Sequence, residues 1–88
     1  MLVLDLPKGT TIDDQLGKVA EEFAEFVNAV IYEDSNEEVL SEFYDVVQAM
    51  IGVLDLKGID KDTIESGALT HIAKLGERGW NIKGTVNL

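Results

Sequence analysis

The chain contains no cysteine, one histidine and one proline among its 88 residues. Without cysteine it can form neither a disulfide nor a thiolate metal site, so its stability has to come from packing, from association between copies or from bound metal. The single histidine, His71, has no second histidine or cysteine to act with. The sequence therefore offers no Cys/His or Ser/His/Asp set for covalent catalysis.

Basic residues and long apolar runs are also scarce. Seven lysines and arginines stand against 17 acidic residues, which gives a formal net charge of -10. Nucleic-acid backbones attract lysine and arginine, so no nucleic-acid partner is expected. No run approaches the roughly 18 apolar residues that span a bilayer, and residues 1–6 lack the features of a signal peptide. We expect a cytoplasmic protein with no membrane partner.

The spacing of apolar residues predicts two long amphipathic helices, over about residues 13–32 and 35–56. Ser35 is followed three residues later by Glu38, which predicts a capping box at the start of the second helix. Gly58 is expected to end it. A short connection makes the two helices antiparallel neighbours.

The rest of the chain carries weaker signals. Asp60 is expected to cap a third helix that runs to about residue 75 and stops at Gly76. Residues 1–6 and 80–88 are expected to be extended and to pair with each other. No linker or low-complexity stretch divides the sequence, so we expect one domain over residues 1–88.

Two helices and a fragment do not close a core, although aromatic residues crowd their apolar stripes. The predicted fold class is therefore all-α, an antiparallel helical bundle completed by homo-oligomerisation into a four-helix core. A homodimer is the simplest such assembly.

Four carboxylates repeat within the two long helices. Val19-x-x-Glu22-Phe23-x-Glu25 recurs 20 residues later as Val39-x-x-Glu42-Phe43-x-Asp45. Residues three apart share one face of a helix, so packing of the two helices brings both acidic pairs together. Such a cluster repels itself unless cations lie among the carboxylates, and Mg²⁺, with Mn²⁺ as a substitute, is the natural ion. The alternative is that the four side chains point outward as a charged rim.

The pattern Glu21-Glu22-Phe-Ala-Glu25 followed by Glu42-Phe-Tyr-Asp45 resembles the E-x-x-E and E-x-x-D signature of the MazG-like all-α nucleoside triphosphate pyrophosphohydrolases. The resemblance covers about residues 13–57, and it implies a dimer, or a tetramer built as a pair of dimers. It implies Mg²⁺-dependent hydrolysis of an NTP or dNTP between the α- and β-phosphates, giving a nucleoside monophosphate and pyrophosphate. It also implies that the catalytic residues and Mg²⁺ ligands are Glu22, Glu25, Glu42 and Asp45. Either Glu25 or Glu22 would orient or deprotonate the attacking water.

Three basic residues are candidates for binding the substrate phosphates. Lys18 lies one helical turn before Glu22, although an ion pair with Asp14 or Glu22 is an equally good role for it. Lys74 and Arg78 are one turn apart and can clamp phosphates if the C-terminal segment folds over the site.

Two other interpretations remain open. Phosphoribosyl-ATP pyrophosphohydrolases carry a similar carboxylate arrangement, but typically have a histidine shortly after the E-x-x-D aspartate, where this chain has Val46-Val47-Gln48. A non-enzymatic helical module that binds a partner is the second alternative. Many relatives also have a polar residue where this chain has Gly52, so its substrate contacts are expected to differ.

Overall fold

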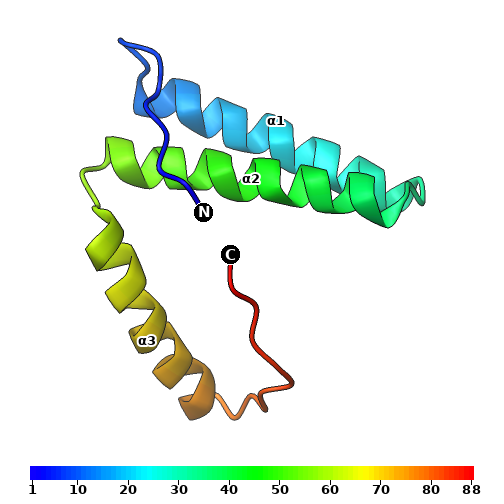
Figure 1. The fold of residues 1–88 in the computed structure, drawn as a ribbon, viewed down its shortest axis with the longest axis vertical. Helices are drawn as coiled ribbons and strands as arrows, with labels where there is room; N and C mark the ends of the chain where they lie inside the picture. The colour runs from blue at the N-terminus through cyan, green and yellow to red at the C-terminus, as the bar shows by residue number, and fades with distance from the viewer.

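The computed structural model describes all 88 residues and contains three α-helices and no strand (Figure 1). Helices α1 (Ile12–Ile31) and α2 (Asn36–Leu56) lie side by side and antiparallel. Helix α3 (Lys61–Glu77) turns away from this pair. The all-α prediction is confirmed, and both long helices begin and end within a residue or so of their expected bounds.

The helix N-termini are fixed by local side-chain hydrogen bonds. Thr11 and Asp14 form a complete capping box at α1: the Thr11 hydroxyl accepts from the Asp14 N–H at 3.1 Å, and the Asp14 carboxylate accepts from the Thr11 N–H at 3.0 Å. At α2, Ser35 accepts from the Glu38 N–H at 3.2 Å, but no bond returns from the Glu38 side chain. The capping box predicted there is therefore only half formed.

All three helices end in the same hydrogen-bond pattern, with one residue of left-handed backbone just past the last turn. Gly58 takes this position after α2, as predicted, with φ of 78°. The prediction that Gly76 ends α3 is wrong: the helix continues to Glu77, and Gly79, with φ of 81°, is the left-handed residue. Local sequence offered both glycines, and the helix uses the later one.

After α1 the left-handed position is held by Glu33, with φ of 54°. The N–H of Asp34 donates to the Ala29 carbonyl at 3.0 Å and closes the pattern. A side chain with a Cβ is disfavoured in this backbone conformation by about 1 kcal/mol or more. The tight turn between α1 and α2 is therefore strained at Glu33.

The single chain has almost no closed core. Only five residues are buried, and the two apolar side chains among them are those of Ala29 and Ala49. The accessible surface is 7172 Å², whereas a compact monomer of this mass exposes about 5,100 Å². The Cα radius of gyration is 15.1 Å, against about 12 Å for a compact chain of this length. The protomer thus exposes about 2,000 Å² more than a closed domain would.

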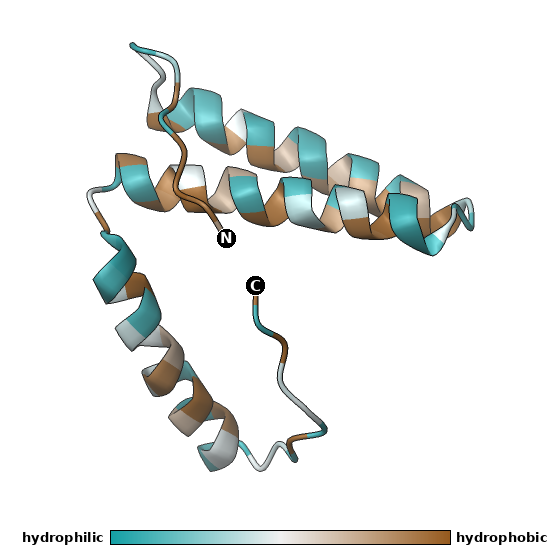
Figure 2. Cartoon of the chain, viewed as in Figure 1, coloured by the Kyte–Doolittle hydropathy of each residue, from teal (hydrophilic) through white to brown (hydrophobic).

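Part of this surface is apolar side chain on the helix pair, although the Phe43 ring contacts those of Phe26 and Tyr44. Phe23 is 55% exposed and Tyr44 44% exposed. Brown apolar segments run along both α2 and α3 in Figure 2. Other large apolar residues of α1 and α2 that are exposed are Ile12, Leu16, Val30, Ile31, Leu40 and Met50.

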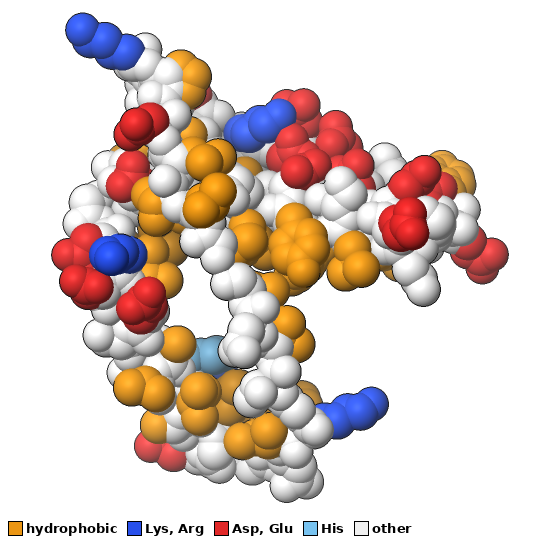
Figure 3. All heavy atoms as spheres, in the orientation of Figure 1, with side chains coloured by type: hydrophobic (Ala, Val, Ile, Leu, Met, Phe, Trp, Pro, Cys, Tyr) orange, Lys and Arg blue, Asp and Glu red, His pale blue; other side chains and the backbone are white.

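Helix α3 packs against neither α1 nor α2. An opening separates it and the C-terminal segment from the helix pair in the space-filling view (Figure 3). The chain ends do meet, because the Met1 amino group donates to the Leu88 carbonyl at 2.7 Å, but they form no strand. The expected pairing of the terminal segments is therefore limited to that one bond. None of the three helices has the length and apolar character needed to cross a membrane.

Candidate active site

The antiparallel packing of α1 and α2 brings the repeated carboxylates together. One carboxylate oxygen each from Glu22, Glu42 and Asp45 lies within 4.8 Å of the other two. Glu22 is buried, Glu42 is half-buried and Asp45 is exposed. The three side chains therefore form a cluster that is closed on the α1 side and open to solvent on the α2 side.

Two oxygens of this cluster have no hydrogen-bond partner. Glu22 Oε2 and Glu42 Oε2 are both inaccessible to solvent and unpaired. Leaving a buried polar atom unsatisfied costs about 1–3 kcal/mol, and more if the group is charged. A hard divalent cation accepts carboxylate oxygens as ligands and would satisfy both atoms, so the cluster fits Mg²⁺ or Mn²⁺.

Glu25 lies beside the three-residue cluster, one turn after Glu22. Repulsion from the Glu22 carboxylate raises the pKa of Glu25, with Glu42 adding to the effect. Acidic side chains gather along the α1 surface in Figure 3. Glu25 is thus close enough to be repelled by Glu22 and Glu42, but it is outside the set whose oxygens can surround a single ion.

Lys18 is paired with the buried carboxylate. Its Nζ lies 2.7 Å from Glu22 Oε1 and 3.8 Å from Glu21 Oε1. This bond raises the pKa of Lys18 and lowers the pKa of Glu22. Of the two ion pairs considered for Lys18, the structure contains the one with Glu22, since the Asp14 carboxylate bonds the Thr11 N–H instead.

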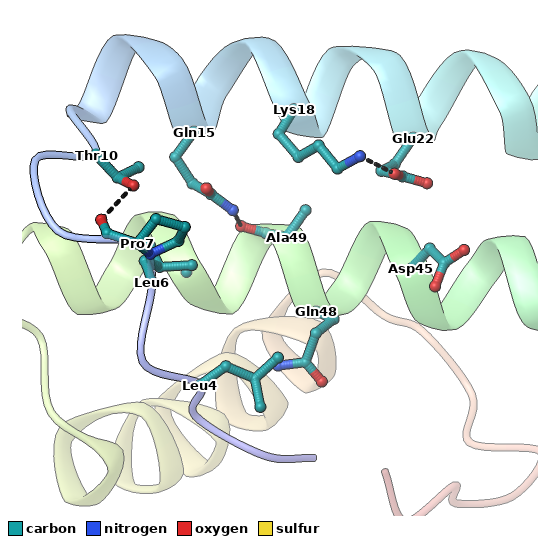
Figure 4. Close-up of a pocket in the computed structure, with 11 residues that line it drawn as sticks. Leu4, Leu6, Pro7, Thr10, Gln15, Lys18, Glu22, Asp45, Gln48 and Ala49 are labelled. Carbon is teal, nitrogen blue, oxygen red and sulfur yellow. Dashed lines mark hydrogen bonds and ion pairs between the residues drawn. The ribbon is translucent and has the colours of Figure 1, made fainter.

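A pocket of about 440 Å³ adjoins the carboxylates (Figure 4). Glu22, Asp45 and Lys18 lie toward one end of it, and Leu6 and Pro7 of the N-terminal segment lie toward the other. This segment crosses α2 and is held there by Gln48, whose Nε2 donates to the Leu2 carbonyl at 2.6 Å. The remaining residues that line the pocket are Leu4, Thr10, Gln15, Gln48, Ala49 and Gly52.

Sequence reasoning missed Gln15, which is only 7% exposed and lies at the α1–α2 contact within the pocket. Its Nε2 donates to the Ala49 carbonyl at 3.1 Å. The available signal was its position, one turn before Lys18 on the face that also carries Glu22. Gly52, which the sequence marked only as a departure from relatives, lies directly against this side chain.

The other predicted phosphate-binding residues lie elsewhere. Lys74 is in the last turn of α3 and Arg78 follows its end, and both are exposed. Because α3 packs on neither long helix, the protomer does not bring them to the carboxylates. His71 is also exposed on α3.

A model of the phosphoribosyl-ATP pyrophosphohydrolase family matches residues 8–67, about two thirds of the chain. The chain belongs to this family. The matched range contains α1, α2 and all four carboxylates. It is an all-α nucleotide pyrophosphohydrolase family related to the MazG-like enzymes, so the broad assignment made from the sequence is confirmed, while the MazG-like branch itself is not. Searches of curated proteins and of solved structures gave no significant match.

Proposed function

We propose that this chain is a Mg²⁺-dependent pyrophosphohydrolase that cleaves an NTP or dNTP between its α- and β-phosphates. Water adds to one phosphorus, the bridging P–O bond breaks, and a nucleoside monophosphate and pyrophosphate leave. The observation that carries the proposal is the convergence of Glu22, Glu42 and Asp45 around two buried, unpaired carboxylate oxygens. Family membership supports the same reaction class.

Glu22, Glu42 and Asp45 would hold the metal, because their oxygens are close enough to share one ion. When bound, Mg²⁺ supplies positive charge against the phosphates and makes water easier to deprotonate. The open Asp45 side of the cluster leaves room for substrate oxygens and waters, which Mg²⁺ retains among its ligands.

Glu25 would accept the proton of the attacking water. It is next to the cluster without belonging to the set that surrounds one ion. Its raised pKa, caused first by Glu22, makes it a stronger base than an ordinary glutamate. This assigns to Glu25 the role that the sequence left open between Glu25 and Glu22.

Lys18 would exchange its carboxylate partner for a phosphate. In the protomer its ammonium neutralises Glu22 at 2.7 Å, where a metal ion would take over that task. The side chain is long and half-exposed, and it lines the pocket. Once released, it can bond a phosphate oxygen with little movement of the helix.

Phosphoribosyl-ATP is the second candidate substrate, and the family match favours it directly. Gln48, Val46 and Val47 stand where those enzymes were expected to carry a histidine, which favours the simpler nucleotides. The two substrates would use the same carboxylates and release the same pyrophosphate. They differ in what the far end of the pocket has to accommodate.

We also propose that the working form is a cytoplasmic homo-oligomer, a dimer or a tetramer built from dimers. The protomer exposes about 2,000 Å² in excess of a compact chain, and each partner in a standard protein interface buries about 800 Å². Exposed large apolar side chains such as Phe23 and Met50 lie along the helix pair. A second copy that covers them would complete the predicted four-helix core.

The test is hydrolysis of an NTP and dNTP panel, together with phosphoribosyl-ATP, in Mg²⁺, with the products separated by chromatography. Monophosphate plus pyrophosphate supports the proposal, and the rate ranking separates the two substrate classes. Orthophosphate plus a diphosphate would mean a different phosphohydrolase. No turnover with either Mg²⁺ or Mn²⁺ would favour a non-enzymatic helical module.

A further inference from the structure

Gln15 is a polar side chain enclosed in the contact between α1 and α2, a position where packed helices usually bury an apolar residue. Only 7% of its surface is exposed. Apart from Glu22 it is the only buried residue with a long side chain. A buried amide that serves no purpose is costly, so its hydrogen bonds indicate what it does.

The orientation of the Gln15 amide is fixed by its partner. The Ala49 carbonyl can only accept, so the NH₂ group must face it, at 3.1 Å. The Oε1 atom then points away from Ala49, accepts no hydrogen bond from the protein, and is not among the solvent-inaccessible unpaired atoms. Gln15 therefore presents a free acceptor to the pocket it lines.

Gly52 lies directly against the Gln15 amide. A Cβ at this position would stand 2.7 Å from Gln15 Nε2 and 3.2 Å from its Cδ, which is too close for either atom. Because the neighbouring side chain is enclosed, it could not simply swing aside. The glycine thus leaves the space that the Gln15 amide occupies.

The free acceptor is separated from the charged end of the pocket. Gln15 precedes Glu22 by seven residues on α1, which is about 10 Å along the helix axis. Leu6 and Pro7 lie near the Gln15 end, and Lys18 stands between Gln15 and Glu22 (Figure 4). A nucleotide has the matching polarity, with phosphates at one end and a flat, largely apolar base at the other.

We propose that Gln15 determines substrate specificity by accepting, at Oε1, a hydrogen bond from a donor on the nucleoside end of the substrate. That donor is an N–H of the base edge or the 2′-hydroxyl of the sugar. The inference rests on the proposed function, because it assumes that the phosphates lie at the carboxylates. It assigns the selective contact to an amide whose orientation the protein fixes before substrate arrives.

The test is calorimetric titration of nucleoside monophosphates with Mg²⁺ into the wild-type protein and Gln15→Met. Each of the four ribonucleotides is paired with its base N-methylated analogue and with its 2′-deoxy counterpart. The wild type should bind the donor-bearing member of one pair about tenfold more tightly than the member that lacks the donor. The reason is that Gln15 Oε1 stays unpaired when the bound nucleotide has no donor to offer. Gln15→Met keeps the side-chain length and should reduce that ratio to within about twofold.

Gly52→Ala provides a second variant that leaves Gln15 in place. Its added methyl group displaces the amide, so it should lose the same discrimination. The matched control is Gly67→Ala in α3, where an added Cβ meets nothing within 4 Å. That variant should keep the wild-type ratio.

The pair of nucleotides that loses discrimination identifies the donor as base or sugar. The inference is overturned if Gln15→Met keeps every wild-type ratio, if it weakens all nucleotides equally, or if the wild type binds no monophosphate. Normal binding ratios with no turnover of any triphosphate would instead contradict the proposed function and leave Gln15 as a binding determinant.

Discussion

The α1–α2 pair and α3 begin and end with the same kinds of local signal, but only α1 and α2 are packed against another helix. Each helix has a capping residue at its start and a left-handed residue just after its end. Yet α1 and α2 enclose specific polar atoms between them, whereas α3 has no buried residue and touches neither. Local signals are enough to form a helix, but only packing fixes where it lies.

The two regions also differ in what their burial serves. In the helix pair the enclosed long side chains are Gln15 and Glu22, and the enclosed apolar ones are only alanines. The fully enclosed part of the α1–α2 contact thus contains polar groups, which agrees with the proposed metal and nucleotide site. The large apolar side chains face outward, where a second copy can cover them.

The largest expected effect is loss of hydrolysis when a carboxylate of the candidate site is replaced. Glu25→Gln and Asp45→Asn should each reduce hydrolysis by about 10²–10⁴-fold, because one removes the base and the other a metal ligand. Neither should unfold the protein, since Glu25→Gln removes a carboxylate that Glu22 and Glu42 repel, and Asp45 is exposed. Steady-state rates and melting temperatures check both statements.

Glu21→Gln is the matched control on the same helix. Glu21 is exposed, and its ion pair with Lys18 is long at 3.8 Å and therefore weak. The turnover of Glu21→Gln should stay within about twofold of wild type. Wild-type turnover in Glu25→Gln or Asp45→Asn would show that the site is assigned to the wrong residues.

The next effect concerns the outward apolar face. Phe23→Glu places a charge on a side chain that is 55% exposed in the protomer but covered in the proposed oligomer. Burying an unpaired charge is costly enough to shift the protein to monomers or to unfold it. Sedimentation equilibrium measures the change, and Phe23→Leu, which keeps the apolar surface, should still associate. A wild-type protein that sediments as a compact 9.7 kDa species would contradict this part of the account.

Acid should first stabilise the metal-free α1–α2 pair and only at lower pH weaken both regions, because Asp14 and Glu22 of α1, like Asp60 of α3, have lowered pKa values. The Thr63 N–H lowers the pKa of the Asp60 cap below its usual 3.8, so the stability it gives α3 is present above that pH and is lost as pH falls through the lowered pKa. The pKa of Glu25 is raised above its usual 4.5, so the metal-free α1–α2 pair should gain stability as pH falls through that raised value. Hydrogen exchange resolved by residue, measured from neutral pH down to about 3, separates the two responses. A common loss of protection in both regions above pH 4.5 would oppose this interpretation.

The smallest effect lies in the turn that joins α1 to α2. Glu33→Gly should stabilise the protein by about 1 kcal/mol, because glycine adopts the left-handed backbone at this position without strain. Urea unfolding gives the free energy. Gly79→Ala is the converse change, since φ there is 81°, and it should weaken only the end of α3. An unchanged or lower stability of Glu33→Gly would mean that the turn is not strained.

The fold follows from the sequence where local chemistry decides it. The spacing of apolar residues predicted the bounds of both long helices to within a residue or so, and Gly58 ends α2 as predicted. The acidic repeat predicted that carboxylates of the two helices come together. Two details of the helix ends were predicted wrongly. Helix α3 continues past Gly76, with Gly79 as its left-handed residue, and the Glu38 side chain does not complete the capping box with Ser35. The energies that decide such cases are a few tenths of a kcal/mol to about one.

Parts of the candidate site depend on contacts between helices and could not be seen in a single segment. Gln15 looked like one more polar residue of α1 until Ala49 and Gly52 were placed against it. Lys18 had two possible acidic partners, and only the structure chose Glu22. The roles of Lys74 and Arg78 depend on where α3 lies relative to the carboxylates, which local sequence does not specify.

The most direct test of the central claim is thermal unfolding of the wild type and Glu42→Gln, each with and without Mg²⁺. A ligand at 100 times its dissociation constant stabilises the native state by about 2.7 kcal/mol. We expect saturating Mg²⁺ to raise the Tm of the wild type by several degrees and to leave that of Glu42→Gln unchanged. Equal behaviour of the two proteins, with or without a shift, would contradict a metal site between α1 and α2.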